Sequence, residues 1–228
     1  NGLDLPDGAE VLSTDHEHIG GIEPWKLVTR RRVLPLRTVS LPAPAASSEE
    51  LLEAVWSGVT DRTRVVCVSH ITFTTGTILP ITELSARCAE RDIVLAVDGA
   101  HPPGMIQMDL NTLGGDFYAS SPHKWLLAPQ GTGLLYIAEP WREKLWPTLA
   151  SGGWDDMTLG AHRFNHMGTM DESRIAGLLA ATEFFHALGM QRVEGRVRYL
   201  RGMLQDGLMH MPGLSLATPS DNALNAGM

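Results

Sequence analysis

Lys124 stands in the segment 120–125, Ser-Ser-Pro-His-Lys-Trp, and two leucines follow it. A lone lysine is ordinarily a solvated surface residue, but these neighbours favour a partly buried side chain. Removal of water disfavours the charged ammonium and leaves a neutral amine that can attack a carbonyl group. The segment therefore indicates carbonyl chemistry at Lys124, with Ser121 and His123 able to donate hydrogen bonds to a phosphate.

Asp98 lies 26 residues before this lysine and directly follows the apolar run 93–97. A carboxylate at the end of a buried strand, followed by Gly and Ala, faces a site rather than bulk water. Its partner there must be a cation, and a pyridinium nitrogen fits, because a charge-assisted hydrogen bond keeps that nitrogen protonated and makes the ring an electron sink. The structural alternative is that Asp98 caps the turn that follows it.

Short apolar runs alternate with helical patterns, as expected for successive βα units. Several runs are apolar nearly throughout, which is typical of a sheet covered on both faces. The expected fold is therefore α/β, a three-layer α/β/α arrangement with a mostly parallel sheet sandwiched by helices. The patterns predict strands at 10–14, 34–40, 65–69, 93–97, 117–119 and 133–137, and helices at 24–32, 49–57, 80–90, 175–188 and 190–209.

Polar side chains of interest follow four of the predicted strands. In open α/β sheets, ligands bind beyond the carboxyl ends of the strands. We therefore expect one site to collect these groups, which are His16 and His18, then Ser69, His70 and Thr74, then Asp98 and His101, then Ser121, His123 and Lys124.

Composition narrows the class of partner. The 228 residues carry a formal net charge of −8, which argues against a nucleic-acid partner. The basic run 30–32 is expected in the last turn of a helix, where cations suit the helix dipole. Two cysteines in apolar contexts predict buried thiols in a reducing compartment, the cytoplasm. We expect no membrane span and no signal peptide, and the absence of an initiator Met suggests a chain that starts partway into a longer protein.

Some of these residues could also belong to a metal site or a nucleotide site. His16 and His18, with the later histidines, raise the possibility of a metal site, but no zincin, cysteine-rich or carboxylate pattern accompanies them. We expect no metal. The turn Gly131-Thr132-Gly133 suggests nucleotide binding, yet it precedes a strand, whereas a dinucleotide fingerprint opens a helix. A tight bend into the sheet is the preferred interpretation.

Together, Asp98-Gly99-Ala100-His101, Ser121-x-His123-Lys124 and Gly131-Thr132-Gly133 resemble the class V aminotransferase group of fold-type I pyridoxal-phosphate (PLP) enzymes. That group includes cysteine desulfurases and isopenicillin N epimerase-like proteins. The resemblance extends over residues 10–208. It implies that residues 1–188 are the PLP-binding major domain without its N-terminal part, and that 189–228 begin the small C-terminal domain or its linking helix.

The resemblance also implies a role for each matching residue. Lys124 would hold pyridoxal 5′-phosphate as a Schiff base and shuttle the substrate Cα proton. Asp98 would pair with the pyridinium nitrogen, and His18 would stack on the ring. These three are the expected catalytic residues. All three also count among the cofactor-binding residues.

The remaining cofactor contacts come from the same resemblance. His101 and Thr74 would lie near the phenolic oxygen, although a Thr hydroxyl makes one such bond and not the pair of an amide. Ser121 and His123 match phosphate ligands. Thr169 matches a residue that reaches the phosphate of the neighbouring subunit, which implies a homodimer. Its alternative role is helix capping, because Thr169-x-x-Glu172 is a capping box.

The implied activity is that of a PLP-dependent enzyme acting on a small amino-acid substrate through a Cα carbanion. The run 68–80 resembles the epimerase-like branch more than the desulfurases, and neither Cys67 nor Cys88 stands where a desulfurase carries its persulfide. A cysteine desulfurase or C–S lyase is the alternative, because these residues do not specify which Cα bond breaks. Alternatives of other classes are a non-catalytic fragment that keeps its dimerisation surface and a flavodoxin-like binding domain.

Overall fold

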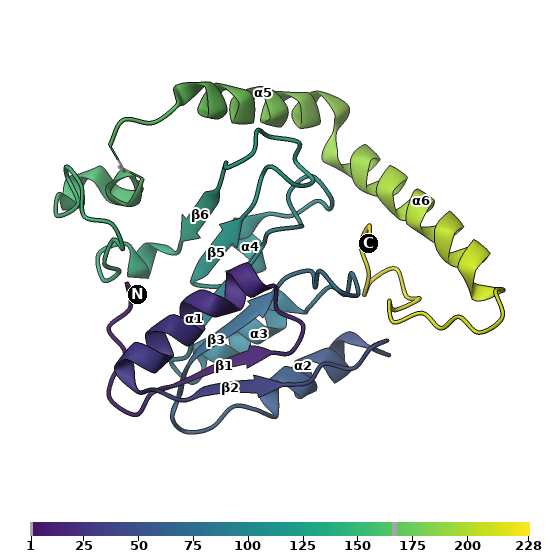
Figure 1. The fold of residues 1–228 in the computed structure, drawn as a ribbon, viewed down its shortest axis with the longest axis horizontal. Coiled ribbons are helices and arrows are strands. Elements are labelled where there is room, and N and C mark those ends of the chain that lie inside the picture. Colours follow the sequence, from purple (N-terminus) through teal and green to yellow (C-terminus); the bar gives the residue numbers. More distant parts are fainter. Residues whose placement is uncertain (1, 166–167) are drawn as a thin grey trace.

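The computed structural model describes residues 2–165 and 168–228 and has a central sheet flanked by helices (Figure 1). Six strands lie in the order β2-β1-β3-β4-β5-β6. Neighbouring strands run parallel except β6, which pairs antiparallel with β5. The predicted, mostly parallel sheet is confirmed. The strands are β1 (Glu10–Thr14), β2 (Leu36–Val39), β3 (Thr63–Ser69), β4 (Val94–Asp98), β5 (Phe117–Ser120) and β6 (Leu134–Ile137).

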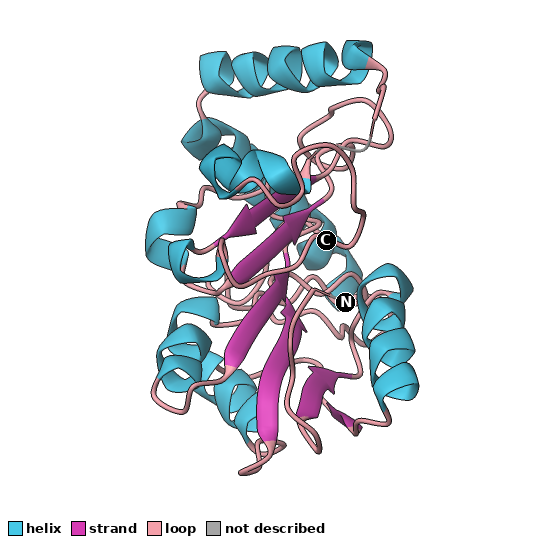
Figure 2. Ribbon diagram, turned by 90° about the vertical axis from the view of Figure 1, so that its left-hand side faces the viewer, coloured by secondary structure: helices cyan, strands magenta, loops and turns pink. Residues whose placement is uncertain are grey.

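Helices cover both faces of the sheet, as Figure 2 shows in profile. Successive strand residues point to opposite faces, so the sheet contributes to two separate cores. On one face, α2 (Ser48–Trp56) and α3 (Ile81–Ala89) pack against buried residues that include Leu12 and Leu95. On the other face, Trp25 of α1 (Ile19–Arg32) packs with Val65. The expected three-layer α/β/α arrangement is confirmed.

Helix α1 begins earlier than the sequence pattern indicated. It was expected to start around Pro24, but the structure places Pro24 inside the helix. The first turn is instead stabilised by His18, whose Nδ1 accepts a hydrogen bond from the Gly20 amide at 3.0 Å. The basic run 30–32 lies in the last turn as predicted. The early start of α1 brings its N-terminus over the ends of the strands.

The chain after β6 forms a helical arm, which we define as α5 (Glu172–Leu188) and α6 (Met190–Met209). Both helices were predicted, but many of their apolar side chains are exposed. Leu179 is 59% exposed, and Phe185 is the buried residue of α5. Shorter elements that the sequence did not indicate are α4 (Leu110–Leu113) and the 3₁₀ helices η1 (Glu139–Trp141) and η2 (Met157–Phe164).

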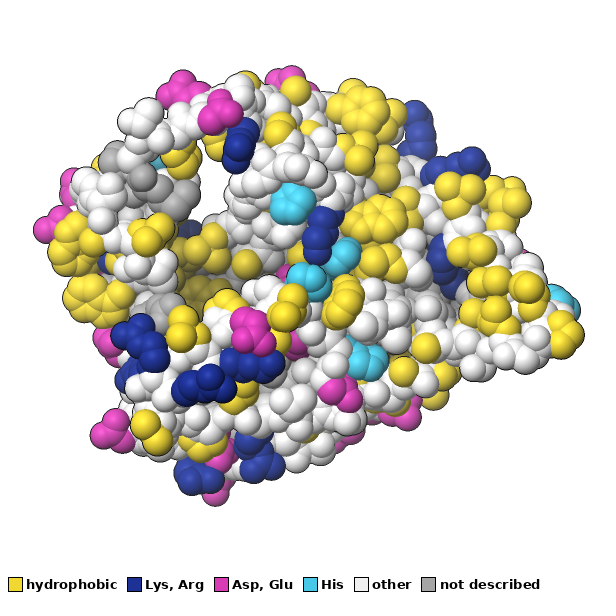
Figure 3. Space-filling model, in the orientation of Figure 1, with side chains coloured by type: hydrophobic (Ala, Val, Ile, Leu, Met, Phe, Trp, Pro, Cys, Tyr) yellow, Lys and Arg dark blue, Asp and Glu magenta, His cyan; other side chains and the backbone are white. Residues whose placement is uncertain are grey.

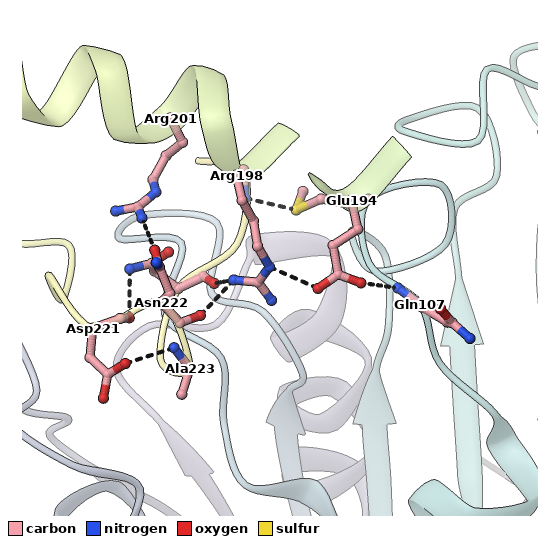
Figure 4. Close-up of polar contacts among 10 residues, drawn as sticks. Gln107, Glu194, Arg198, Arg201, Asp221, Asn222 and Ala223 are labelled. Carbon is pink, nitrogen blue, oxygen red and sulfur yellow. Dashed lines mark hydrogen bonds and ion pairs between the residues drawn. The ribbon is translucent and has the colours of Figure 1, made fainter. Parts of the chain in front are cut away.

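The segment after α6 returns to the sheet and is held there by polar contacts, drawn in Figure 4. Arg198 of α6 donates hydrogen bonds to the backbone carbonyls of Asn222 and Asn225. Leu224, only 2% exposed, is part of the core beside α2 and α3. The tail therefore fastens the arm to the sheet. The division between residues 188 and 189 into two domains stays a prediction. No helix of the described residues is long and apolar enough to cross a membrane.

Candidate active site

A cavity of about 720 Å³ lies on the α1 side of the sheet, beside the carboxyl ends of the parallel strands. This volume is typical of a small-molecule site. The cavity collects side chains from the start of α1, from β3 and β4, and from the loop after β5. Its lining includes His18, Gly20, Gly21, Trp25, Val28, Cys67, Ala96, Asp98, Ser121, His123 and Lys124. Five of the sequence-predicted site residues therefore meet in one place.

The Lys124 amine contacts a histidine that the sequence also singled out. Its Nζ lies 3.2 Å from Nε2 of His101, and the other ring nitrogen, Nδ1, accepts a hydrogen bond from Trp125 Nε1 at 3.2 Å. Burial, together with the positive charges of Lys124 and His18, lowers the pKa of His101 to about 4. His101 is therefore a neutral imidazole at pH 7, held between an indole and an amine.

Asp98 has a structural role and a cavity-facing role. Its Oδ1 accepts a hydrogen bond from the Ala100 amide at 3.0 Å, so the predicted capping alternative holds for this oxygen. The other oxygen, Oδ2, lies beside Gly21 of α1. A Cβ added at Gly21 would stand only 2.7 Å from Oδ2. Glycine at this position lets the helix approach while leaving the carboxylate in place.

His18 combines helix capping with a position in the cavity wall. Because Nδ1 accepts from the backbone of Gly20, the orientation of the ring is tied to the first turn of α1. The ring also packs edge-on against Phe73, with centroids 5.1 Å apart. His18 is thus held from two sides where a planar ligand would meet it.

Glu17 is a site residue that sequence reasoning missed. Its carboxylate accepts hydrogen bonds from Thr14 Oγ1 at 2.7 Å and from the amide and hydroxyl of Ser69 at 3.1 and 2.7 Å. Burial raises the pKa of this carboxyl despite those bonds. Glu17 ties the end of β1 to the end of β3 directly before His18. An acidic residue among the strand-end histidines was the available signal.

The structure does not bring Thr74 or Thr169 into this cavity. Thr74 is exposed on the loop after β3. Thr169 lines a second cavity of about 890 Å³, together with Gly168, Glu172 and Ile175. The capping alternative for Thr169 is wrong, because α5 is capped by Asp171, which accepts from the Ser173 amide at 3.0 Å.

His123 lines the cavity in a defined tautomer. Its Nδ1 lies 3.1 Å from the carbonyl oxygen of Thr132, in the bend at residues 131–133. Because a carbonyl only accepts hydrogen bonds, Nδ1 carries the proton. In the neutral ring Nε2 is then an acceptor. His123 donates to an anion through Nε2 only as an imidazolium cation, which narrows the phosphate role expected from the sequence.

The cysteines are buried thiols, as the sequence indicated. Burial raises the pKa of Cys67 well above its ordinary value, and it raises that of Cys88 to about 12. Neither thiol is therefore a ready nucleophile. Within residues 2–165 and 168–228, no group of three His, Cys, Asp or Glu side chains is arranged to hold a metal ion.

Sequence comparison decides the family of this chain. The profile of the family described as Aminotransferase class-V matches residues 1–228. The chain belongs to this family. It is 35% identical over 240 residues to isopenicillin N epimerase from Streptomyces clavuligerus, covering 99% of this chain and 60% of that protein. It is 30% identical to probable cysteine desulfurase 2 from Mycobacterium leprae, covering 93% and 51%.

Solved structures share the fold. The cysteine desulfurase CsdA from Escherichia coli superposes with a TM-score of 0.82 at 25% identity, over 97% of this chain and 57% of that one. A mutant of C-DES, solved with glycine covalently linked to its PLP cofactor, superposes with a TM-score of 0.77 at 28% identity, over 92% and 58%. The chain thus spans about three-fifths of the length of several of these relatives.

Proposed function

We propose that this chain is the PLP-binding part of an enzyme that acts on an amino acid, with Lys124 as the residue that holds the cofactor. The observation that carries the proposal is the meeting of Lys124, Asp98 and His18 around one cavity of about 720 Å³. An amine, a carboxylate and a flat ring are the groups that a pyridoxal aldehyde, ring nitrogen and ring face require.

The residues of this cavity fit pyridoxal phosphate. Apolar side chains such as Trp25, Val28 and Ala96 line much of the wall, which suits an aromatic ring. Because residue 21 is glycine, it places no side chain against Asp98 Oδ2. Ser121 and His123 lie in the same lining and would supply a hydroxyl and, in its protonated form, an imidazolium for the phosphate. When bound, PLP supplies an electron sink for negative charge at the substrate Cα.

The protein's own residues then have distinct tasks. Lys124 would hold the aldehyde of the cofactor and would move a proton at the substrate Cα. Asp98 keeps the ring nitrogen protonated through a charge-assisted hydrogen bond. His18 covers the ring, and Glu17 keeps the segment before His18 attached to β3 through its bonds with Ser69.

Among the reactions open to this arrangement, we favour epimerisation of an amino acid. Support comes from the 35% identity with isopenicillin N epimerase and from the two thiols, which burial keeps protonated. A cysteine desulfurase or C–S lyase is the second candidate, supported by the resemblance to CsdA and C-DES. Exchange of the Cα proton in D₂O without sulfide release supports the first activity. Sulfide or persulfide release supports the second.

We further propose that the protein acts as a homodimer in the cytoplasm. The arm exposes apolar side chains such as Phe184, 53% exposed, that a second subunit would cover. Thr169 lines a cavity separate from that of Lys124, as expected if it serves the neighbouring subunit. Two free, buried cysteines suit a reducing compartment. Light scattering that shows a stable monomer loaded with PLP would remove the role of Thr169.

Titration of the chain with PLP tests the central proposal. We expect a Lys124-dependent absorbance band of the bound cofactor, which Lys124→Ala abolishes. Lys26→Ala is the matched control, since Lys26 lies on the outside of α1 and pairs with Glu23 at 2.8 Å. Asp98→Asn should weaken binding about 10- to 100-fold through loss of a charge-assisted bond. If parent and Lys124→Ala behave alike, the chain is a non-catalytic fragment instead.

A further inference from the structure

His101 is contacted on both ring nitrogens by groups of different chemistry. Trp125 Nε1 lies 3.2 Å from Nδ1, and Lys124 Nζ lies 3.2 Å from Nε2. An indole N–H is a donor only. Nδ1 must therefore present its lone pair to Trp125, and the proton of the neutral ring is left on Nε2.

We propose that Trp125 is a positioning residue that sets the tautomer of His101, so that an Nε2–H donor faces Lys124, whose side chain lines the cavity. An ammonium group has three donors and no acceptor. The contact between Nε2–H and Nζ is therefore a hydrogen bond only when Lys124 is the neutral amine that attacks an aldehyde. Once that amine is engaged, the same N–H is free for an acceptor such as a phenolic oxygen of the ligand. This second use rests on the proposed function.

The indole that makes this contact is fixed by its surroundings. Trp125 packs against the buried cluster of Ile71, Met105, Ile106 and Ala226. Its own backbone is approached by Gly104, where an added Cβ would stand 2.4 Å from the Trp125 carbonyl carbon. On the far side, Cη2 of the indole lies 3.3 Å from the position of a Cβ at Gly227. Both the loop and the returning tail thus hold the N–H in its direction.

The charged groups around His101 favour a neutral ring but do not choose its tautomer. Lys124 and His18 are the groups whose charges act on it, and both oppose protonation of the imidazole, in addition to burial. The indole N–H favours the ring proton on Nε2, whereas an ammonium at Lys124 would compete by donating to Nε2. His123 shows the opposite arrangement, because the Thr132 carbonyl holds the proton on Nδ1.

The two histidines give the test an internal reference. Nitrogen-15 NMR of the histidine-labelled chain, recorded without added PLP, distinguishes a protonated from an unprotonated ring nitrogen. In a Lys124→Met chain, where no ammonium competes for Nε2, we expect His101 as the Nε2–H tautomer and neutral His123 as the Nδ1–H tautomer. Because no PLP is present, this outcome is independent of whether the chain binds the cofactor. A failure of the proposed function is therefore distinguishable from a failure of this inference.

Trp125→Phe removes the donor and keeps an aromatic ring. The ratio of Nε2–H to Nδ1–H tautomers of His101 should fall roughly 3- to 10-fold, the equivalent of one lost hydrogen bond. Trp141→Phe is the matched control, because its indole N–H bonds to Asp116 Oδ1 at 2.7 Å, and it should leave His101 unchanged.

If Trp125→Phe does not fold, 3-benzothienylalanine at position 125 preserves the shape of the indole without its N–H. An unchanged His101 tautomer in the variant that folds would overturn the inference. An Nδ1–H tautomer of His101 in the Lys124→Met chain would overturn it as well.

Discussion

The sheet region, residues 2–137, and the helical arm differ in how they use apolar side chains. In the sheet region, large residues such as Leu51, Leu84 and Leu95 are at most 1% exposed. In the arm, Phe185 is buried, while Leu204 of α6 is 63% exposed. Figure 3 shows hydrophobic side chains gathered over α6 at the right of the molecule. The same kinds of residue therefore contribute very differently to stability in the two regions.

The difference shows which part of the chain determines the site. The cavity with Lys124 and Asp98 is built almost wholly from the sheet region, whose buried side chains form two cores. The arm is joined to the sheet region by polar contacts, such as the backbone N–H of Gln107 with the Glu194 carboxylate at 2.8 Å (Figure 4), and by Val197, which packs against the cluster around Met105. The tail that follows the arm packs beside Trp125. Substitutions in the sheet region and in the arm should therefore have clearly different effects.

A pair of identical substitutions tests this contrast with the largest expected effect. Leu95→Ala removes a side chain that is 1% exposed in the core of the sheet, and it should cost about 2–5 kcal/mol of unfolding free energy. Leu179→Ala changes a residue 59% exposed on α5 and should cost about 0.5 kcal/mol or less. Urea unfolding of both variants measures the difference. Similar costs would mean that the arm is as well packed as the sheet.

The sheet region also contains a buried titratable group that should make its stability depend on pH. Burial lowers the pKa of His70 from 6.5 to about 4. Between pH 6.5 and about 4, His70 therefore binds a proton in the unfolded chain but not in the folded chain. The contribution of His70 to the free energy of unfolding is fully present above pH 6.5 and is lost as the pH falls toward 4.

In His70→Gln, the free energy of unfolding should fall less with decreasing pH than in the parent, by up to about 3 kcal/mol over that pH interval. Unfolding free energies measured at several pH values between neutrality and pH 4 provide the check. A variant whose pH slope equals that of the parent would show that His70 is not buried as a neutral ring.

The smallest effect concerns backbone strain at helix ends. Val33, which ends α1, has a φ of 55°, a conformation that a β-branched residue rarely adopts. The arm uses Gly189 for the same purpose at the end of α5, with a φ of 81°. Val33→Gly should raise the melting temperature by an amount that corresponds to about 1 kcal/mol of unfolding free energy. PLP binding should not change. A lower melting temperature would show that Val33 contributes packing which its 89% exposure does not reveal.

Much of the fold followed from the sequence, because β-branched runs and glycine-rich strand ends are local signals. The same logic placed His18, Asp98 and Lys124 together, since parallel strands β1, β4 and β5 present their carboxyl ends at one edge. The start of α1 was missed because its cap is a histidine, which is not among the usual capping residues.

Contacts between distant segments were beyond the sequence. The bond of Glu17 to Ser69 joins residues 52 positions apart, and the place of Glu17 among the strand-end histidines does not by itself reveal that partner. The sequence also did not indicate that most apolar side chains of α5 would be exposed to solvent. Its periodicity predicts a buried face, whereas only packing partners decide whether that face is covered.

The most direct test of the account is to locate the lysine that PLP modifies. The chain is mixed with PLP, reduced with borohydride, digested and mapped by mass spectrometry. Lys26 and Lys144 are the other lysines of the sequence and serve as internal references. We expect the reduced cofactor on Lys124 at a level well above that on Lys26 or Lys144. Modification spread evenly over the three lysines, or absent from Lys124, would contradict it.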